Sequence, residues 1–266
     1  MIVIKFGGSV INDLHESVLK DLHRVSVKEK MLIVHGGGNE VTSMATKLGK
    51  EQRFIVSPGG IRSRYTDMET AEIYTMVMSG KVNKHIVRML LKDGLKAVGL
   101  SGIDNNILSA VRKEKLAVIN EKGRRMFIDG GYTGKIKSVR TELLELLLGK
   151  GYLPVISPVA LSEEFDFLNV DGDRAAAYIA GNLNAEKVIF LTYVRGLYMD
   201  DKLVKRISAL EAKHILPKIG FGMEKKVLAC TEAISLGANE AIIASGNTSN
   251  PISSALSHLD CTVISR

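Results

Sequence analysis

The sequence predicts an α/β protein in which a central, largely parallel sheet lies between two layers of helices. Three observations support this fold class. Short apolar runs alternate with segments of helical periodicity along the whole chain. Two of those runs end in glycine clusters. The 266 residues are enough for one large α/β domain or for two fused lobes, which we place at residues 1–165 and 166–266.

The first strand, Met1–Phe6, is apolar except for Lys5 and stops at the turn Gly7–Ser9. Short runs rich in Ile and Val are typical of buried strands in parallel sheets. A strand that ends in glycines before a helix points its backbone N–H groups at an anion, and Lys5 could reach the same anion. A single match of this kind would favour an ordinary strand with a solvated lysine. Because Met31–Gly38 repeats the pattern, we predict a phosphate site where the two turns meet.

The second glycine turn belongs to neither of two common nucleotide motifs. In a dinucleotide-binding G-x-G-x-x-G phrase, the third glycine would fall at Val41. No Walker A sequence occurs in the chain, which argues against a P-loop enzyme.

The helices of the first half follow from apolar spacing and capping residues. Apolar residues recur at helical spacing over Asp13–Val25 and over Asn39–Leu48, where Asn39 is the expected N-cap. Thr66 and Glu69 have the spacing of a capping box and open a long apolar helix. We expect that helix to end at Asp93-Gly94, after which a strand follows at Lys96–Leu100.

The second half begins with a change of pattern. Short alternating segments broken by glycines predict antiparallel ribbons over Asn105–Val139. The remaining strands are expected at Tyr152–Ser157, Lys187–Thr192, Leu203–Arg206 and Glu240–Ala244. The remaining helices are expected at Thr141–Leu148, from the Asn169–Asp173 segment to Asn182, from Ser208, and at Glu224–Leu236.

Positive charge is concentrated in one segment of the chain. Residues 1–165 hold 25 Lys and Arg against 18 Asp and Glu, whereas residues 166–266 hold 11 of each. Residues 105–140 alone hold nine basic against three acidic residues, a net charge of +6. Nucleic acid is a possible partner, but the segment lacks the interleaved aromatic residues of a base-stacking surface. An acidic substrate or an acidic protein explains the charge equally well.

Composition also restricts the protein class. Apolar residues make up 45% and charged residues 24% of the chain, which is ordinary for globular proteins. No apolar stretch is long enough to span a bilayer, and the chain opens on a strand rather than on a signal sequence. Cys230 and Cys261 have no metal-like spacing, so we expect free thiols in a cytoplasmic protein. We expect neither a membrane nor a nucleic-acid partner.

Seven motifs resemble the amino-acid kinase family, and within it the N-acetylglutamate kinase branch. They occur in order from Lys5 to Gly246: KFGGSV, HGGG, SRYTD, GKVNKHIV, AVGLSGID, NVDGD and GMEKKV. Gly59-Gly60 and the loop GGYTGKI at Gly130–Ile136 further resemble the aminoadipate kinases, whose substrate is attached through its amino group to LysW, a small acidic carrier protein. Archaeal members of that group also accept carrier-bound glutamate. The basic segment fits this resemblance, because charge complementarity would steer an acidic carrier.

The resemblance implies an amino-acid kinase fold with an acceptor lobe at residues 1–165 and a nucleotide lobe at residues 166–266. The implied reaction is ATP-dependent phosphorylation of a side-chain carboxylate to an acyl phosphate, in lysine or arginine biosynthesis. Mg²⁺ would be bound mainly through phosphates and water. A homodimer is also implied, with the long helix from Thr66 to Leu91 as the contact. Two alternatives stay open: an N-acetylglutamate kinase, and a regulator that binds ATP and an amino acid without turnover.

The resemblance also assigns roles to individual residues. The catalytic residues would be Lys5, Asp173 and Lys226, with the adjacent Lys225 expected as a surface charge. Acceptor binding would fall to Gly37, Gly38, Arg64 and Asn169. Phosphate and nucleotide binding would fall to Gly7, Gly8, Thr192, Gly196, Tyr198, Gly222 and Met223, although Tyr193 replaces an aspartate that is common in the family. For carrier docking we select Arg112, Lys113, Lys115, Arg124, Arg125, Lys135 and Lys137.

Overall fold

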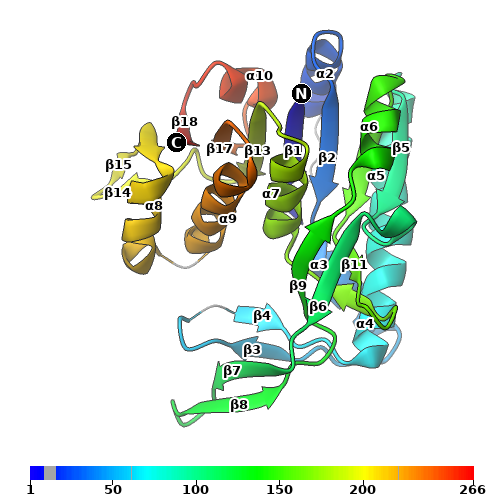
Figure 1. The fold of residues 1–266 in the computed structure, drawn as a ribbon, viewed down its shortest axis with the longest axis vertical. Helices are drawn as coiled ribbons and strands as arrows, with labels where there is room; N and C mark the ends of the chain where they lie inside the picture. The colour runs from blue at the N-terminus through cyan, green and yellow to red at the C-terminus, as the bar shows by residue number, and fades with distance from the viewer. Residues whose placement is uncertain (9–15, 61, 221) are drawn as a thin grey trace.

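The computed structural model describes residues 1–8, 16–60, 62–220 and 222–266. Within these residues eight strands form one central sheet, and helices cover both of its faces (Figure 1). Neighbouring strands of this sheet are parallel, except that the strands Glu240–Ser245 and Cys261–Ser265 pair antiparallel. The predicted α/β/α fold class is therefore confirmed. Across the sheet the strands are β16 (Arg206–Ser208), β18 (Cys261–Ser265), β17 (Glu240–Ser245), β13 (Lys187–Thr192), β1 (Ile2–Phe6), β2 (Met31–His35), β10 (Leu153–Ser157) and β5 (Ala97–Ser101).

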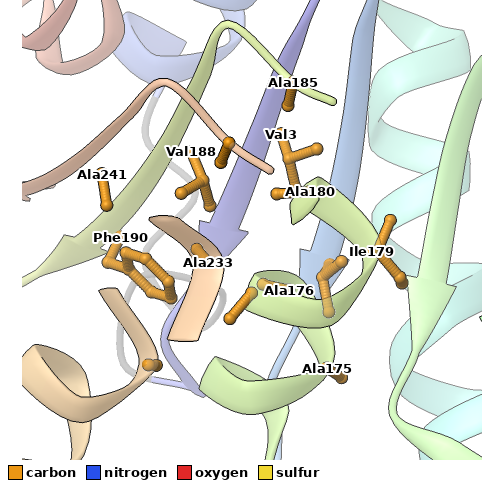
Figure 2. Close-up of a cluster of buried hydrophobic side chains, with 14 of the residues drawn as sticks. Val3, Ala175, Ala176, Ile179, Ala180, Ala185, Val188, Phe190, Ala233 and Ala241 are labelled. Carbon is orange, nitrogen blue, oxygen red and sulfur yellow. The ribbon is translucent and has the colours of Figure 1, made fainter. Parts of the chain in front are cut away.

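Two buried cores lie on the two faces of this sheet. Side chains alternate between the faces along a strand, so Ile4 and Phe6 join one core while Val3 joins the other. The first core packs against α2 (Glu16–Ser26), α3 (Gly38–Lys47), α4 (Met68–Thr75), α5 (Asn83–Lys92) and α10 (Pro251–Leu256). The second packs against α6 (Glu142–Gly149), α7 (Gly172–Asn182), α8 (Ala209–Ile215) and α9 (Met223–Leu236). Figure 2 shows the second core, where Val3 lies beside the small residues of α7.

The long helix forms as predicted but begins differently. It runs through α4, a π-helical segment at Met76–Val82, and α5 without a break. Its N-cap is Asp67, whose carboxylate accepts from the N–H of Thr70, so the predicted capping box of Thr66 and Glu69 is wrong. Thr66 is fully buried, and its hydroxyl instead accepts from Asn169 Nδ2 at 3.0 Å.

The cap of α3 also differs from the prediction. Gly37 is the N-cap, with φ 144°, and Asn39 lies inside the first turn. A short 3₁₀ turn at Asp104–Asn106 follows β5, and another at Leu216–Lys218 follows α8. Among the described residues, no helix is long and apolar enough to cross a lipid bilayer.

The basic segment folds into the predicted antiparallel ribbon. Its strands are β6 (Leu108–Arg112), β7 (Lys115–Ile119), β8 (Arg125–Asp129) and β9 (Gly134–Val139), with β6 paired to β9 and β7 paired to β8. The base of the ribbon joins β11 (Val159–Leu161) and β12 (Phe167–Asn169) in a four-stranded sheet. A second hairpin, β3 (Phe54–Val56) with β4 (Arg62–Arg64), was not predicted and contacts β7 at the bottom of Figure 1.

The C-terminal part differs from the prediction: α10 and β18 were not expected, and one strand is misplaced. The expected strand Leu203–Arg206 is split: β15 (Lys202–Leu203) pairs with β14 (Tyr198–Met199), whereas β16 joins the central sheet. The two proposed lobes meet inside that sheet, where β1 and β13 pair, and their boundary stays a prediction. Three predicted positions, Ser9, Asp13 and Leu14, lie outside the described residues.

Candidate active site

Two lysines from distant parts of the chain meet at one aspartate. The Nζ atom of Lys5, near the end of β1, forms an ion pair with Oδ1 of Asp173 at 2.6 Å. Lys226, in the first turn of α9, donates a hydrogen bond to Oδ2 of Asp173 at 2.9 Å. Lys5 and Asp173 are only 7% and 6% exposed. The structure therefore brings together all three residues predicted as catalytic, in a buried cluster that carries one net positive charge.

Close packing of two helices holds this cluster in place. Helix α7 begins at the N-cap Asp171, whose carboxylate accepts from the N–H groups of Asp173 and Arg174. The Ala-rich face of α7 packs against the sheet, and Gly181 lets α9 approach, because a Cβ there would lie 2.3 Å from the Cβ of Leu236. This close approach holds the C-terminal ends of α7 and α9 together, and Asp173 and Lys226 meet at the opposite ends of the same two helices.

The aspartate is ionised at neutral pH. Burial by itself would raise the pKa of Asp173, but the adjacent ammonium groups of Lys5 and Lys226 outweigh burial and hold that pKa well below its usual range. The single negative charge of Asp173 is therefore shared by two ammonium groups, which leaves one positive charge uncompensated. The remaining positive charge is available to an anion in the adjoining cavity.

The two glycine turns lie side by side, as predicted. A Cβ on Gly8 would lie 3.4 Å from the backbone nitrogen of Gly37, and one on Gly36 would lie 3.1 Å from the nitrogen of Gly8. Gly37 also has a positive φ, and a Cβ there would lie 3.1 Å from Sδ of Met78. The Gly7 N–H already donates to the carbonyl of Leu191, at 3.4 Å, so it is not a free donor.

A cavity of about 560 Å³ adjoins the cluster. Its walls come from the glycine turn after β2, the β3–β4 hairpin, the β6–β9 ribbon and the starts of α7 and α9. Six of the predicted catalytic and acceptor residues line it, namely Lys5, Gly37, Gly38, Arg64, Asn169 and Asp173. The residues predicted for the nucleotide do not line this cavity.

Arg64 and Asn169 are held in the cavity wall by hydrogen bonds. Arg64 Nη2 donates to the Gly38 carbonyl and to Thr42 Oγ1, each at 2.8 Å, and Nη1 donates to Gln52. Asn169 Nδ2 donates to Thr66 Oγ1 at 3.0 Å. Both side chains are therefore positioned before any ligand is present. A carboxylate or an amide in the cavity would find their remaining hydrogen-bonding atoms in fixed places.

The other predicted nucleotide residues lie outside this cavity, at or after the carboxyl end of β13 and at the start of α9. Thr192 is the last residue of β13. Gly196 lies so close to the Thr262 hydroxyl that a Cβ would meet it at 2.4 Å. Tyr193 and Tyr198 are exposed side chains. Gly222 is the N-cap of α9 with φ 88°, and Met223 follows it as the first residue of the helix.

The seven predicted docking residues do not share one environment. Lys113 lines the cavity. Arg112 pairs with Asp129 at 3.5 Å and stacks on the Tyr132 ring, and Lys137 pairs with Glu163. The other four are exposed on the ribbon: Lys115, Arg124, Arg125 and Lys135.

The sequence analysis missed two features of the site. His35, in the HGGG motif, is fully buried; its Nδ1–H donates to the Gly36 carbonyl at 2.8 Å, and its Nε2 accepts from Asn83 at 3.2 Å. Burial lowers the pKa of His35 to about 4, so the ring is neutral. Lys225, expected as a surface charge, lines the cavity. Asn83 lies in the GKVNKHIV motif and His35 in the HGGG motif, but no local pattern in the sequence indicates that the two side chains meet.

Comparison with known proteins identified a family, full-length relatives and similar folds. The profile of the amino acid kinase family matches residues 1–245. A LysW-aminoadipate/LysW-glutamate kinase of Saccharolobus solfataricus is 42% identical over 265 residues, covering 99% of both chains. A protein of Nitrosopumilus maritimus that bears the same name provisionally is 58% identical over 264 residues, again 99% of both. The crystal structure of smu.665 from Streptococcus mutans superposes with a TM-score of 0.78 at 19% identity, covering 99% of this chain and 98% of that one.

Proposed function

Because the chain belongs to the amino acid kinase family, we propose that it transfers the terminal phosphoryl group of ATP to a side-chain carboxylate of a carrier-bound amino acid. The acceptor is 2-aminoadipate or glutamate held on LysW, and the product is an acyl phosphate in lysine and arginine biosynthesis. Full-length relatives at 42% and 58% identity support this acceptor. The observation that carries the proposal is the meeting of Lys5 and Lys226 on Asp173, beside a cavity that Arg64 and Asn169 line.

The reaction needs positive charge rather than a general base. A side-chain carboxylate with an ordinary pKa near 4.3 is already ionised at neutral pH and can attack directly. The obstacle is the approach of an anion to a polyanion, so catalysis depends on positioning and on cations around the transferring group. In the proposed arrangement Lys5 and Lys226 neutralise the phosphoryl oxygens from two sides. Asp173 fixes both ammonium groups and keeps them apart, and one such donor contributes about 3–4 kcal/mol in comparable oxyanion sites.

The acceptor and the nucleotide enter from different sides in this proposal. Arg64 binds the α-carboxylate of the acceptor as a fixed guanidinium, and Asn169 binds the amide that links the amino acid to its carrier. The glycine turns at Gly8 and Gly37 lie between the two ligands. The nucleotide lies along the segment from Thr192 to Tyr198 and the start of α9.

Mg²⁺ enters the proposal only through the phosphates. Within the described ranges, no group of three or more His, Cys, Asp or Glu side chains is placed to hold a metal. Both carboxylate oxygens of Asp173 are occupied by lysines. These residues do not form a metal cage, and no step of the proposed mechanism depends on one.

Two parts of the proposal concern macromolecular contacts. The long helix exposes Met68, Met76 and Leu91 by more than half, which supports its role as the contact of a homodimer. The exposed basic side chains of the β7–β8 hairpin support docking of an acidic carrier through charge complementarity. Light scattering of the purified chain measures the first, and the salt dependence of carrier binding measures the second.

A substrate comparison tests the reaction. The protein is incubated with ATP and carrier-linked aminoadipate, carrier-linked glutamate or free N-acetylglutamate, and the acyl phosphate is trapped with hydroxylamine. We expect kcat/KM to be highest for a carrier-linked substrate. Faster turnover of N-acetylglutamate would favour the N-acetylglutamate kinase, and absence of turnover would favour a regulator. Lys5→Ala should abolish turnover while ATP binding persists; unchanged turnover would refute the role of Lys5.

A further inference from the structure

The cavity holds more positive charge than the proposed reaction uses. Among the residues described, two carboxylates line it, Asp171 and Asp173. Six basic side chains line it as well: Lys5, Arg62, Arg64, Lys113, Arg174 and Lys225. Like charges that face one cavity repel each other, and the repulsion is relieved when an anion binds between them.

Most of these groups already have partners or roles. Asp171 caps helix α7, and Asp173 is occupied by its two lysines. Arg174 forms a bidentate pair with Glu232 outside the cavity. Arg62 stacks on the Phe54 ring, 4.3 Å from its centre. Lys113 and Lys225 remain. In the part of the chain that the structure describes, no carboxylate lies within ion-pair distance of either ammonium group.

Lys225 occupies a position that is unfavourable for a cation. It lies in the first turn of α9, where the positive end of the helix dipole disfavours positive charge. Lys226, in the same turn, is compensated by Asp173, but Lys225 is not. Its Nζ atom only donates to the Arg62 carbonyl at 3.4 Å, across the cavity on the β3–β4 hairpin. An anion in the cavity would compensate both the helix end and the ammonium group.

Lys113 is fixed at the bend of the ribbon between β6 and β7. Its carbonyl packs against Gly130, where a Cβ would lie 1.5 Å from that oxygen, so only glycine fits opposite it. The side chain is half-buried. Burial, together with the nearby charge of Arg174, lowers the pKa of Lys113 from its usual value. The ammonium group is thus held in a place that disfavours its charge while no anion is bound.

We propose that Lys113 and Lys225 form a second carboxylate subsite, which binds an acidic group of the carrier protein next to the point where the amino acid is attached. This inference rests on the proposed function. Both lysines face the acceptor side: Lys113 belongs to the ribbon, and Lys225 reaches the hairpin that carries Arg64. The residues proposed for the nucleotide lie outside the cavity. A small N-acylated amino acid has no carrier group to fill this subsite, so the subsite favours binding of carrier-linked acceptors.

The test uses Lys113→Gln, Lys225→Gln and the double variant, with Lys150→Gln as a matched control on the exposed end of α6. For each protein we measure kcat and KM with carrier-linked aminoadipate, with N-acetylglutamate and with ATP. We expect the double variant to raise KM for the carrier-linked substrate at least tenfold. The KM for ATP and the kcat/KM for N-acetylglutamate should change less than twofold. Lys113→Arg with Lys225→Arg should restore most of the lost affinity.

Each result has a separate meaning. If the wild type fails to use carrier-linked substrate, the proposed function falls, and this inference falls with it. If the wild type uses it and the double variant has an unchanged KM, only the subsite is refuted. An increase confined to the KM for ATP would assign the lysines to the nucleotide and would also refute the subsite. Because the Arg variants keep the charge, their failure to restore affinity in folded protein would contradict an electrostatic role.

Discussion

The cluster around Asp173 and the outer hairpins are built on opposite principles. The cluster draws its members from one strand and two helices that pack on the central sheet; Lys5 and Asp173 are buried, and the Lys226 side chain is only 19% exposed. The hairpins place charge at the surface, where Arg62 lies 4.3 Å from the centre of the Phe54 ring and Arg125 lies 5.5 Å from that of Phe127. The difference indicates that the proposed phosphoryl chemistry depends on fixed geometry, whereas the proposed docking of the carrier depends on exposed surface side chains.

The ion pairs of the two regions show the same contrast. In the Lys5–Asp173 pair the side chains are 9% and 8% exposed. In the Lys137–Glu163 pair of the ribbon they are 57% and 68% exposed. Exposed pairs contribute little because water and salt screen them, while loss of one partner from a buried pair leaves an uncompensated charge. Substitutions in the two regions should therefore differ both in stability and in catalysis.

The largest effect is expected from Asp173→Asn. This change keeps the side-chain shape but leaves two buried ammonium groups without their shared anion. We expect a loss of about 3–5 kcal/mol in the free energy of unfolding, measured with urea. We also expect kcat to fall by about 10²–10³, because the lysines lose their positions. Glu163→Gln is the surface control and should leave the urea midpoint unchanged; equal losses in the two variants would remove the contrast between the regions.

A smaller effect, and one that depends on pH, is expected from the buried His35. Its pKa is about 4 in the folded protein and 6.5 without burial, so the unfolded chain takes up the additional proton first as pH falls. The contribution of the neutral His35 ring to the free energy of unfolding is fully present above pH 6.5. It is lost as the pH drops toward 4, by about 3 kcal/mol in total. Wild type and His35→Gln should therefore differ in the slope of stability against pH in this window. Parallel curves would show that His35 is accessible to protons in the fold.

The smallest effect on stability is expected at the tip of the ribbon. Arg125→Gln removes an exposed guanidinium that lies near Phe127, and we expect the free energy of unfolding to change by less than about 1 kcal/mol. The same variant should raise KM for the carrier-linked substrate severalfold at low salt, and the difference should vanish at high salt. A salt-independent change would mean that the residue acts through packing rather than charge.

Much of the fold could be predicted from the sequence because local signals agreed with the tertiary structure. The apolar runs at Met1–Phe6 and Lys187–Thr192 became central strands, and the glycines after β1 and β2 met as expected. Predictions failed where a tertiary contact decided the outcome. The hydroxyl of Thr66, which the capping box would need, instead accepts a hydrogen bond from Asn169, and Asp67 caps the helix.

Within the candidate site, the motifs predicted which residues would meet but not what surrounds them. The resemblance to the amino-acid kinase family implied that Lys5, Asp173 and Lys226 lie together, and in the structure both lysines contact Asp173. The position of Lys225 in the cavity wall depends on how α9 faces the β3–β4 hairpin. The sequence analysis did not predict that hairpin. Contacts between elements so far apart in sequence leave no local pattern.

The outward projection of the two hairpins has a consequence for protein engineering. The segment Phe54–Arg64 and the segment Lys113–Thr133 extend from the molecule, and the strands of the central sheet lie outside both. The two segments could therefore be exchanged as a pair with those of a relative that acts on another acceptor. Such a chimera would keep Lys5, Asp173 and Lys226 on their original supports, so a new preference could be introduced without rebuilding the cluster around Asp173.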